Sequence, residues 1–152
     1  MTGLDLYSAQ DSITTYIKSK IPWVVQTGSI PTAESLPFVN GVLEPYVVLR
    51  FSDMLSVAKD YTFAGPQYDG YYSLFDALCI AALDTQARQL ATLVNQAVLG
   101  MQLPNVSAIT KQYGGGSFAV LDTARLPAAF VSNVAFRFQT NISDVGAGTL
   151  VT

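Results

Sequence analysis

The stretch that decides the fold runs from Asp69 to Gly100 and reads Asp-Gly-Tyr-Tyr-Ser-Leu-Phe-Asp-Ala-Leu-Cys-Ile-Ala-Ala-Leu-Asp-Thr-Gln-Ala-Arg-Gln-Leu-Ala-Thr-Leu-Val-Asn-Gln-Ala-Val-Leu-Gly. Its first half is almost continuously apolar from Leu74 to Leu83, which is typical of a central strand covered on both faces. Alternation along this strand predicts one face made of Tyr72, Leu74, Leu78, Ile80 and Ala82, and an opposite face made of Phe75, Ala77, Cys79 and Ala81.

The second half of the stretch predicts a helix. Asp84 is suited to cap its start, because a carboxylate accepts hydrogen bonds from backbone N–H groups that lack intrahelical partners. Gly100 suits the position just after its last residue. One apolar stripe would face the core, made of Ala87, Leu90, Ala91, Val94, Ala97 and Val98. A buried strand that leads directly into a helix is a scaffold, so the function must be sought around it.

The composition favours assembly with other protein. The chain has 152 residues, and we predict a single domain over 1–152 with a core of ordinary size. Charged residues make up 12%, against about 25% in typical soluble domains. Interface cores are poor in charge and rich in aromatic residues, and the chain has eight Tyr and eight Phe. A neutral surface of Ser, Thr and Gln is the simpler alternative, over which we favour assembly.

Charge and residue types disfavour several functions. The net charge is −3 and the basic residues do not cluster, which disfavours specific binding of nucleic acid. The chain has no histidine, the commonest metal ligand and general base, so we expect no metal and no cofactor. Cys79 is the only cysteine and cannot form a disulfide within the chain, so we expect a small core residue there.

Neither a secretory signal nor a membrane span is predicted. The N-terminus has no basic region leading into an apolar run. The apolar segment 74–83 contains Asp76 and has about half the length that crosses a bilayer. We therefore expect a protein that is made in a cytoplasm and stays outside membranes.

Five segments are predicted before the central stretch. Residues 4–21 predict a helix, and 23–27 a short strand. Residues 28–45 predict a long irregular loop, and such loops are usually functional or held by a partner. Residues 46–52 alternate as a strand does, whereas 53–61 fit either a loop or a short helix.

Turns and short strands surround the predicted helix. Turns are expected at Gly65–Pro66 and Asp69–Gly70, and short strands at 109–113 and 118–122. The tail from 142 to 152 is small and weakly polar, and we expect it to pack on a neighbour or to be loose.

The last strand shows the clearest alternation. Its inward residues would be Val134, Phe136 and Phe138, and its outward residues Ala135, Arg137 and Gln139. The order of elements indicates an α+β fold, with a mixed, mainly antiparallel sheet packed against the N-terminal helix and one long central helix.

No group of residues predicts catalysis. The carboxylates of Asp60, Asp69 and Asp76 are spaced neither as a calcium loop nor as a two-metal site. Asp69 before Gly70 fits a turn. Asp76 could be a buried hydrogen-bonding group or the partner of an arginine in another subunit.

Two further motifs have structural explanations. The run Gly114–Ser117 lacks the lysine and the following helix of a phosphate loop, so a hairpin or mobile tip is preferred. Tyr68, Tyr71 and Tyr72 could stack on bases but lack basic neighbours, so a core edge or an interface is preferred. We predict that the protein is not an enzyme.

The succession of elements resembles the tail terminator proteins of long-tailed bacteriophages, small proteins that form a ring at the head-proximal end of the tail tube. The resemblance covers residues 4–141. It is carried by the N-terminal helix, Pro45-Tyr-Val-Val-Leu, the strand and helix of the central stretch, Val120-Leu-Asp-Thr-Ala-Arg-Leu-Pro-Ala-Ala-Phe and Phe136-Arg-Phe-Gln-Thr. The insert at 28–45 and the tail after 142 match no feature of the family.

The resemblance implies a structural virion protein of the phage neck, assembled in the host cytoplasm. Its partners would be other copies in a homohexameric ring, the tail tube protein and the connector or stopper of the head. The ring would end tail polymerisation and leave a channel for DNA. Six copies would carry about −18 charges, and an acidic lumen repels phosphate, so DNA would pass without specific binding.

Residue type alone suggests where the subunits touch. Arginines at 50, 88 and 137 would meet acids such as those at 69, 76 or 122, and the tyrosines near residue 70 would add contact area. The candidate interface residues are Arg50, Tyr68, Asp69, Tyr71, Asp76, Arg88, Asp122 and Arg137.

Two alternatives stay open. Another neck or tail protein, such as a head-completion stopper or a tail tube subunit, fits the same composition, although a tube protein should have longer β-rich sheets. The less favoured alternative is a monomeric α+β domain that binds a small apolar ligand beneath its sheet.

Overall fold

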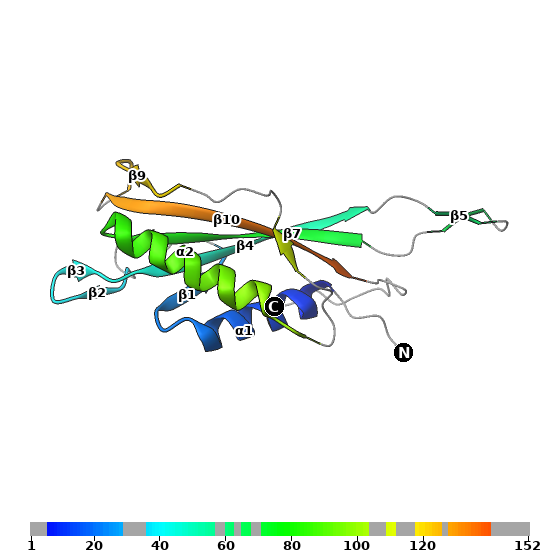
Figure 1. Cartoon of the computed structure of the whole chain (residues 1–152), viewed down its shortest axis with the longest axis horizontal. Coiled ribbons are helices and arrows are strands. Elements are labelled where there is room, and N and C mark those ends of the chain that lie inside the picture. The colour runs from blue at the N-terminus through cyan, green and yellow to red at the C-terminus, as the bar shows by residue number, and fades with distance from the viewer. Residues whose placement is uncertain are drawn as a thin grey trace.

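The computed structural model describes residues 6–28, 36–56, 60–62, 65–67, 71–103, 109–111, 118–125 and 128–140. These residues form two helices and a mixed, mostly antiparallel sheet, so the predicted α+β class is confirmed (Figure 1). No helix in this part of the chain is long and apolar enough to cross a membrane.

The helices are the N-terminal and central ones that the sequence predicted. They are α1 (Leu6–Lys20) and α2 (Asp84–Leu99). The strands are β1 (Val24–Thr27), β2 (Phe38–Val39), β3 (Val42–Leu43), β4 (Tyr46–Ser56), β5 (Asp60–Thr62), β6 (Gly65–Gln67), β7 (Tyr71–Ala81), β8 (Thr110–Lys111), β9 (Val120–Asp122) and β10 (Ala129–Thr140).

Three long strands form the centre of the main sheet. The strand order is β1-β4-β7-β10-β8, and β9 also pairs with β10. β1 runs parallel to β4, while the other pairs of this sheet are antiparallel. β4, β7 and β10 have 11, 11 and 12 residues, about twice the usual strand length of ~5–6.

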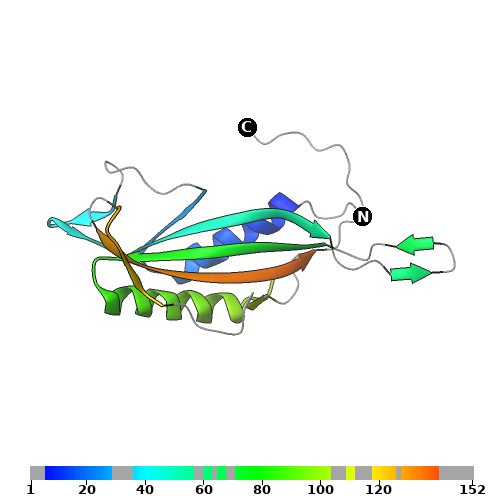
Figure 2. The same cartoon turned by 90° about the horizontal axis from the view of Figure 1, so that it is seen from above.

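Both helices cover the same face of this sheet, because buried residues of α1 and α2 share one core cluster with the same side of β4, β7 and β10. Figure 2 shows α2 running along the three long strands. α1 packs against β1 and β4, and α2 packs against β7 and β10. The rings of Phe51 and Phe136 lie on either side of Phe75, with centroid distances of 5.5 and 5.2 Å. The main core therefore lies between the three long strands and the two helices.

β7 is buried on both faces over its second half, as the sequence predicted. Phe75, Ala77 and Cys79 face the helices, and Leu78 and Ile80 face away from them. The segment 36–43 covers this second face at one end of the sheet through Leu36 and Leu43. Among the residues whose side chains are described, burial on the face away from the helices is thus confined to that end.

α2 carries the predicted apolar stripe but not the predicted cap. Ala87, Leu90, Ala91, Val94 and Val98 are buried. Leu83 occupies the cap position and no side chain caps the helix start, so the prediction for Asp84 was wrong. Asp84 is instead the first helical residue and pairs with Arg88 one turn later, at 3.1 Å. Its carboxylate also lies at the positive end of the helix dipole.

The predicted irregular loop at 28–45 contains a β-hairpin. Asn40 and Gly41 have φ angles of 52° and 77°, and two consecutive positive φ values make the tight turn that joins β2 to β3. Asn-Gly between apolar pairs is a strong hairpin signal, which outweighs the proline and glycine content of the segment. Residues 29–35 lie outside the described residues.

The described residues of the segment 53–61, which are 53–56 and 60–61, are in strands rather than in a loop or a helix, and 57–59 lie outside the described residues. β4 continues to Ser56, and β5 then pairs with β6, so the hairpin formed by β4 and β7 is prolonged beyond the main sheet. Gly65–Pro66 begins β6, so the turn expected there was wrong. The turn at Asp69–Gly70, the run 114–117 and the tail 142–152 lie outside the described residues.

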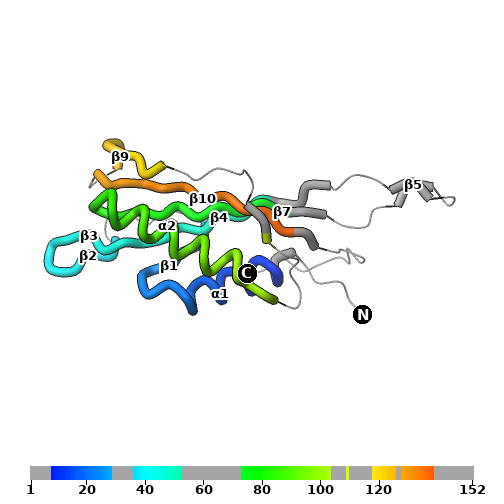
Figure 3. The backbone as a smooth tube through the Cα atoms, in the orientation of Figure 1, coloured from blue at the N-terminus to red at the C-terminus, as the bar shows by residue number. Residues whose placement is uncertain are grey.

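The last part of the chain follows the prediction closely. β8 and β9 fall within the two predicted short strands. In β10, Val134, Phe136 and Phe138 are buried, whereas Arg137 is exposed. β10 pairs with β7 along the full length of β7, and Figure 3 shows the two strands side by side.

Because Leu90 is fully buried in the core, we expect its truncation to cause a large loss of folding stability. We expect Leu90→Ala to lower the free energy of unfolding by about 2–5 kcal/mol, because it removes buried methyl groups and leaves a cavity. The exposed Gln96 on the same helix provides the control, and Gln96→Ala should change stability by less than about 0.5 kcal/mol. Urea unfolding of both variants measures the difference, and equal midpoints would contradict this packing.

Candidate functional site

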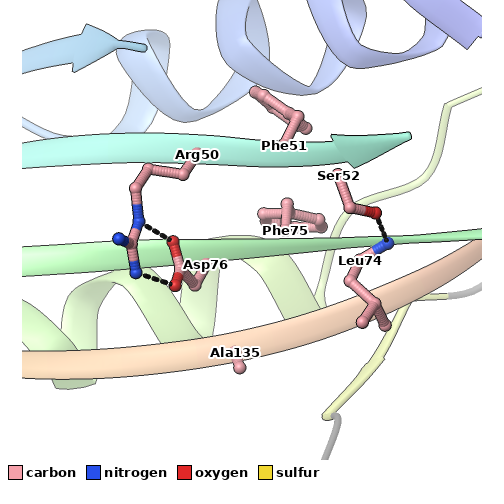
Figure 4. Close-up of a pocket in the computed structure, with 7 residues that line it drawn as sticks. All are labelled: Arg50, Phe51, Ser52, Leu74, Phe75, Asp76 and Ala135. Carbon is pink, nitrogen blue, oxygen red and sulfur yellow. Dashed lines mark hydrogen bonds and ion pairs between the residues drawn. The ribbon is translucent and has the colours of Figure 1, made fainter. Parts of the chain in front are cut away.

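One half of the sheet face opposite the helices is open, and it holds a close ion pair. We call it the open half-face and define it by Arg50, Leu74, Asp76, Ala135 and Arg137, which the strand register brings to one side of β4, β7 and β10. Figure 4 shows four of these residues beside the pocket described below.

Arg50 and Asp76 face each other across β4 and β7. Arg50 Nε donates to Asp76 Oδ1 at 2.8 Å, and Arg50 Nη2 donates to Oδ2, so the contact is bidentate. The hydrogen bonds to Asp76 raise the pKa of the Arg50 guanidinium. The side chains are 51% and 20% exposed, so water screens the pair.

A β-bulge lies directly next to this pair. The register of β4 against β7 shifts between Phe51 and Met54, where two residues of β4 oppose Leu74 alone. Ser52 Oγ accepts from the Leu74 N–H at 2.9 Å, and the Ser52 carbonyl accepts from Ser73 Oγ at 3.2 Å and from Gln10 Nε2 at 3.1 Å. Side chains thus form hydrogen bonds with backbone N–H and C=O groups that the bulge takes out of the hydrogen bonding between the strands.

The bulge borders an open pocket of about 450 Å³. Its lining combines the ion pair of Arg50 and Asp76 with the apolar side chains of Leu74 and Ala135. Such a surface can bind a group through one charged contact and adjoining apolar contacts. Within the described ranges, His, Cys, Asp and Glu nowhere gather in groups of three that could hold a metal ion.

A second distinctive surface lies at the end of the sheet where α2 begins. We call it the apolar end, and it consists of Phe38, Val39, Val42, Leu83, Val120 and Leu121, which are 44–61% exposed. Figures 1 and 2 both show β2, β3, β9 and the start of α2 at this end. Exposed apolar patches of this kind mark interaction surfaces.

Beneath the apolar end lies a partly buried polar group. The Arg125 side chain is only 16% exposed, and its Nε lies 3.0 Å from Asp122 Oδ2, although without the geometry of a hydrogen bond. Asp122 Oδ1 accepts from the Ala124 N–H at 3.1 Å. Burial raises the pKa of the nearby Tyr46, and this effect outweighs the opposite influence of Arg125. Asp122 is therefore paired within its own chain.

The structure brings together some of the predicted interface residues and separates others. Arg50, Asp76 and Arg137 share the open half-face, while Arg88 lies on α2 and Asp122 on β9. The three arginine–carboxylate pairs seen in the described residues all form within one chain.

Tyr71 lies in β7, at the end of its pairing with β4 and β10. Tyr68 and Asp69 lie outside the described residues. Contact of these side chains with a neighbouring subunit stays a prediction.

Sequence reasoning did not single out Gln10, Ser52 or Arg125. Gln10 and Ser52 matter only because a bulge forms, and no local pattern marks a one-residue register shift. In contrast, the sequence Asn40–Gly41 between apolar residues does predict the hairpin of β2 and β3 at the apolar end.

Because the Arg50–Asp76 pair is exposed to water, we expect it to contribute only modestly to the free energy of unfolding. In a double-mutant cycle of Arg50→Ala and Asp76→Ala, we expect a coupling energy of about 0.2–1 kcal/mol that shrinks in about 1 M salt. Urea unfolding of the four proteins at low and high salt measures it. A coupling several times larger that is independent of salt would show that the pair is buried.

Cys79 predicts a loss of stability in alkaline solution. Burial raises the pKa of its thiol from 9.0 to about 12, so above about pH 9 the unfolded state loses a proton that the folded state keeps. Stability therefore falls as pH rises, by up to about 1.4 kcal/mol per pH unit from this group. Cys79→Ala should remove that part of the slope in urea unfolding series between pH 8 and 11. An unchanged slope would contradict the assignment.

No protein-family model matches this chain, and no curated protein matches it significantly. The function must therefore be argued from the two surfaces themselves.

Proposed function

We propose that this protein is a structural subunit of a bacteriophage tail. In this proposal its copies form a ring that caps the head-proximal end of the tail tube, ends tail polymerisation and provides the interface to the head connector with a DNA channel. The observation that carries the proposal is the apolar end, since a protein that works alone has little use for six exposed large hydrophobic residues at one end.

The hairpin of β2 and β3 is the most protruding part of the apolar end. Its pairing places Phe38 and Leu43 on one side, where Leu43 is buried, and Val39 and Val42 on the other side, where both are exposed. A two-stranded hairpin is only marginally stable by itself in water. Contact with a neighbouring subunit would bury the exposed valines and stabilise the hairpin.

Two distinct surfaces on one subunit suit a ring. In a head-to-tail ring each subunit uses one surface to contact the next copy and a different surface to be contacted. The apolar end and the open half-face differ in position and chemistry, and 12% charged residues leave much of the remaining surface neutral. The acidic balance of −3 per chain is compatible with a channel through which DNA slides.

One observation favours a tail tube subunit as the second candidate. The strands β4, β7 and β10 are long, and β5 and β6 extend the central hairpin further. Longer β-rich sheets are expected of a tube protein. Gold-labelled antibody on assembled tails distinguishes the candidates, because a terminator labels one site near the head and a tube subunit labels the whole tail. Absence from particles would overturn both.

The role of the apolar end predicts the effect of a charge placed there. We expect Val42→Asp to leave folding intact, since the side chain is exposed, but to weaken subunit association by tenfold or more, on the order of the cost of burying an unpaired charge. In phage tails assembled with this variant, electron micrographs should show tails of irregular length.

Thr92→Asp, at an exposed position of α2 away from the apolar end, is the matched control and should give tails of normal length. Circular dichroism checks that both variants are folded. Tails of uniform length with Val42→Asp would remove the apolar end as the assembly surface.

A further inference from the structure

We propose that the hairpin of β2 and β3 on one copy of this chain packs into the pocket of the open half-face on the next copy. This inference rests on the ring of the proposed function and names the two surfaces that meet in it. It commits to one occupant of the open half-face, which is a second copy of this chain.

The hairpin is apolar on both of its sides, but only one side is covered within the chain. Its pairing places Phe38 opposite Leu43 and Val39 opposite Val42. Leu43 belongs to the core cluster on the face of the sheet away from the helices, whereas Val39 and Val42 are 52% and 59% exposed. Strands that are apolar on both sides are typically covered on both. The outer side of the hairpin, with Val39 and Val42, therefore calls for a cover that comes from outside the chain.

The outer side of the hairpin also carries an acid. The Glu44 N–H donates to the Pro37 carbonyl at 2.8 Å, so the pairing of the two strands continues to this residue. Side chains alternate along a strand, which places Glu44 on the same side as Val42. Among the described residues, no arginine or lysine forms an ion pair with Glu44. The outer side thus combines apolar contact area with one carboxylate available to a partner.

The pocket of the open half-face has the complementary chemistry. Leu74 and Ala135 give it an apolar lining, and Arg50 gives it a positive charge (Figure 4). Arg50 is 51% exposed and donates to Asp76 through Nε and Nη2, which leaves Nη1 for a further acceptor. A carboxylate that accepts there, such as that of Glu44 on the next copy, forms a charge-assisted hydrogen bond.

The apolar end is large enough for a stable contact. Its six side chains are each about half exposed and together present on the order of 500 Å² of surface. A stable interface buries roughly 800 Å² on each partner, and about 60% of that area is apolar. The apolar end can therefore supply the apolar part of one interface with a second copy.

The shapes of the two surfaces favour a head-to-tail contact. The hairpin projects at one end of the molecule, whereas the pocket is a recess of about 450 Å³ (Figure 1). Two hairpins packed against each other would bring two Glu44 carboxylates together, and like charges repel. A projecting surface that enters a recess on the next copy leaves both copies with one unused surface, so the contact can repeat around a ring.

Chemical cross-linking of the full chain tests this proposal. Cys79 is buried, so it does not react with a thiol reagent. The test chain carries Val42→Cys on the hairpin and Ala135→Cys in the pocket, and a short bismaleimide joins two cysteines that lie close together.

We expect a ladder of covalent dimers, trimers and larger species on a denaturing gel, because each chain then has one cysteine on each of the two contact surfaces. Chains with Val42→Cys alone or Ala135→Cys alone should remain monomeric. Val42→Cys combined with Thr92→Cys, at an exposed position of α2, is the matched control and should form no ladder.

Charge reversal tests the contact between Glu44 and Arg50. Glu44→Lys in the test chain should lower the yield of the ladder about tenfold, because it places like charges opposite each other. Adding Arg50→Glu should restore most of the yield, which a mere loss of folding would not do.

Three results would overturn the proposal. One is the absence of a ladder from the test chain at concentrations up to about 1 mM, where even weak contacts form. Another is a covalent dimer of the chain with Val42→Cys alone, which would mean that two hairpins meet. The last is a ladder whose yield Glu44→Lys leaves unchanged. Antibody labelling of tails decides the proposed function separately, since copies in a tail can also meet through other surfaces.

Discussion

The fold depends on the burial of β7 from both sides. Its neighbours β4 and β10 enclose it within the sheet, the two helices cover one face, and the segment 36–43 covers half of the other. The ring of Phe75, which contacts those of Phe51 and Phe136, ties the three long strands to each other on the side of the helices. Because stabilisation grows with the apolar area removed from water, a strand buried on both sides contributes more than a strand of the same composition buried on one side. The polar features occur where this two-sided burial ends, at Ser52, Ser73 and the ion pair of Arg50 and Asp76.

Much of this architecture could be predicted from periodicity. The apolar run of β7, the stripe of α2 and the alternation of β10 each repeat over several residues, so one unusual residue does not hide the pattern. The extension of β4 and the pairing of β5 with β6 were missed because their residues alternate weakly. The cap of α2 was assigned to Asp84 by residue type, yet the chain leaves β7 so abruptly that Leu83 already occupies the cap position and Asp84 is helical. The start of α2 is therefore determined by how the chain leaves the sheet, and not by the preference of Asp84 for a cap position.

The candidate surfaces were less predictable than the fold. Residue type alone suggested that arginines and acids would meet, and Arg50 and Asp76 do meet, but within one chain and because the register of two strands aligns them. The bulge depends on a one-residue mismatch between two strands, and Ser52 in it contacts residues 21 and 42 positions away, Ser73 and Gln10, which no short pattern encodes. The apolar end arises from three separate segments, and each of them alone has the ordinary look of a strand or a helix start. Surfaces of this kind become visible only when distant segments are placed side by side.

The parallel pairing of β1 with β4 explains the length of the chain between them. An antiparallel neighbour can be reached by a tight turn, but a parallel one requires the chain to travel back to the starting level before the next strand begins. Thr27, the last residue of β1, lies opposite Leu49, whereas Tyr46, the first residue of β4, lies opposite Val24. The connection must therefore return along about the length of β1, and it uses this passage to cover Leu78 and Ile80. The long insert between β1 and β4 is thus a crossover that the topology of the sheet requires. The hairpin of β2 and β3, which forms part of the apolar end, belongs to this crossover.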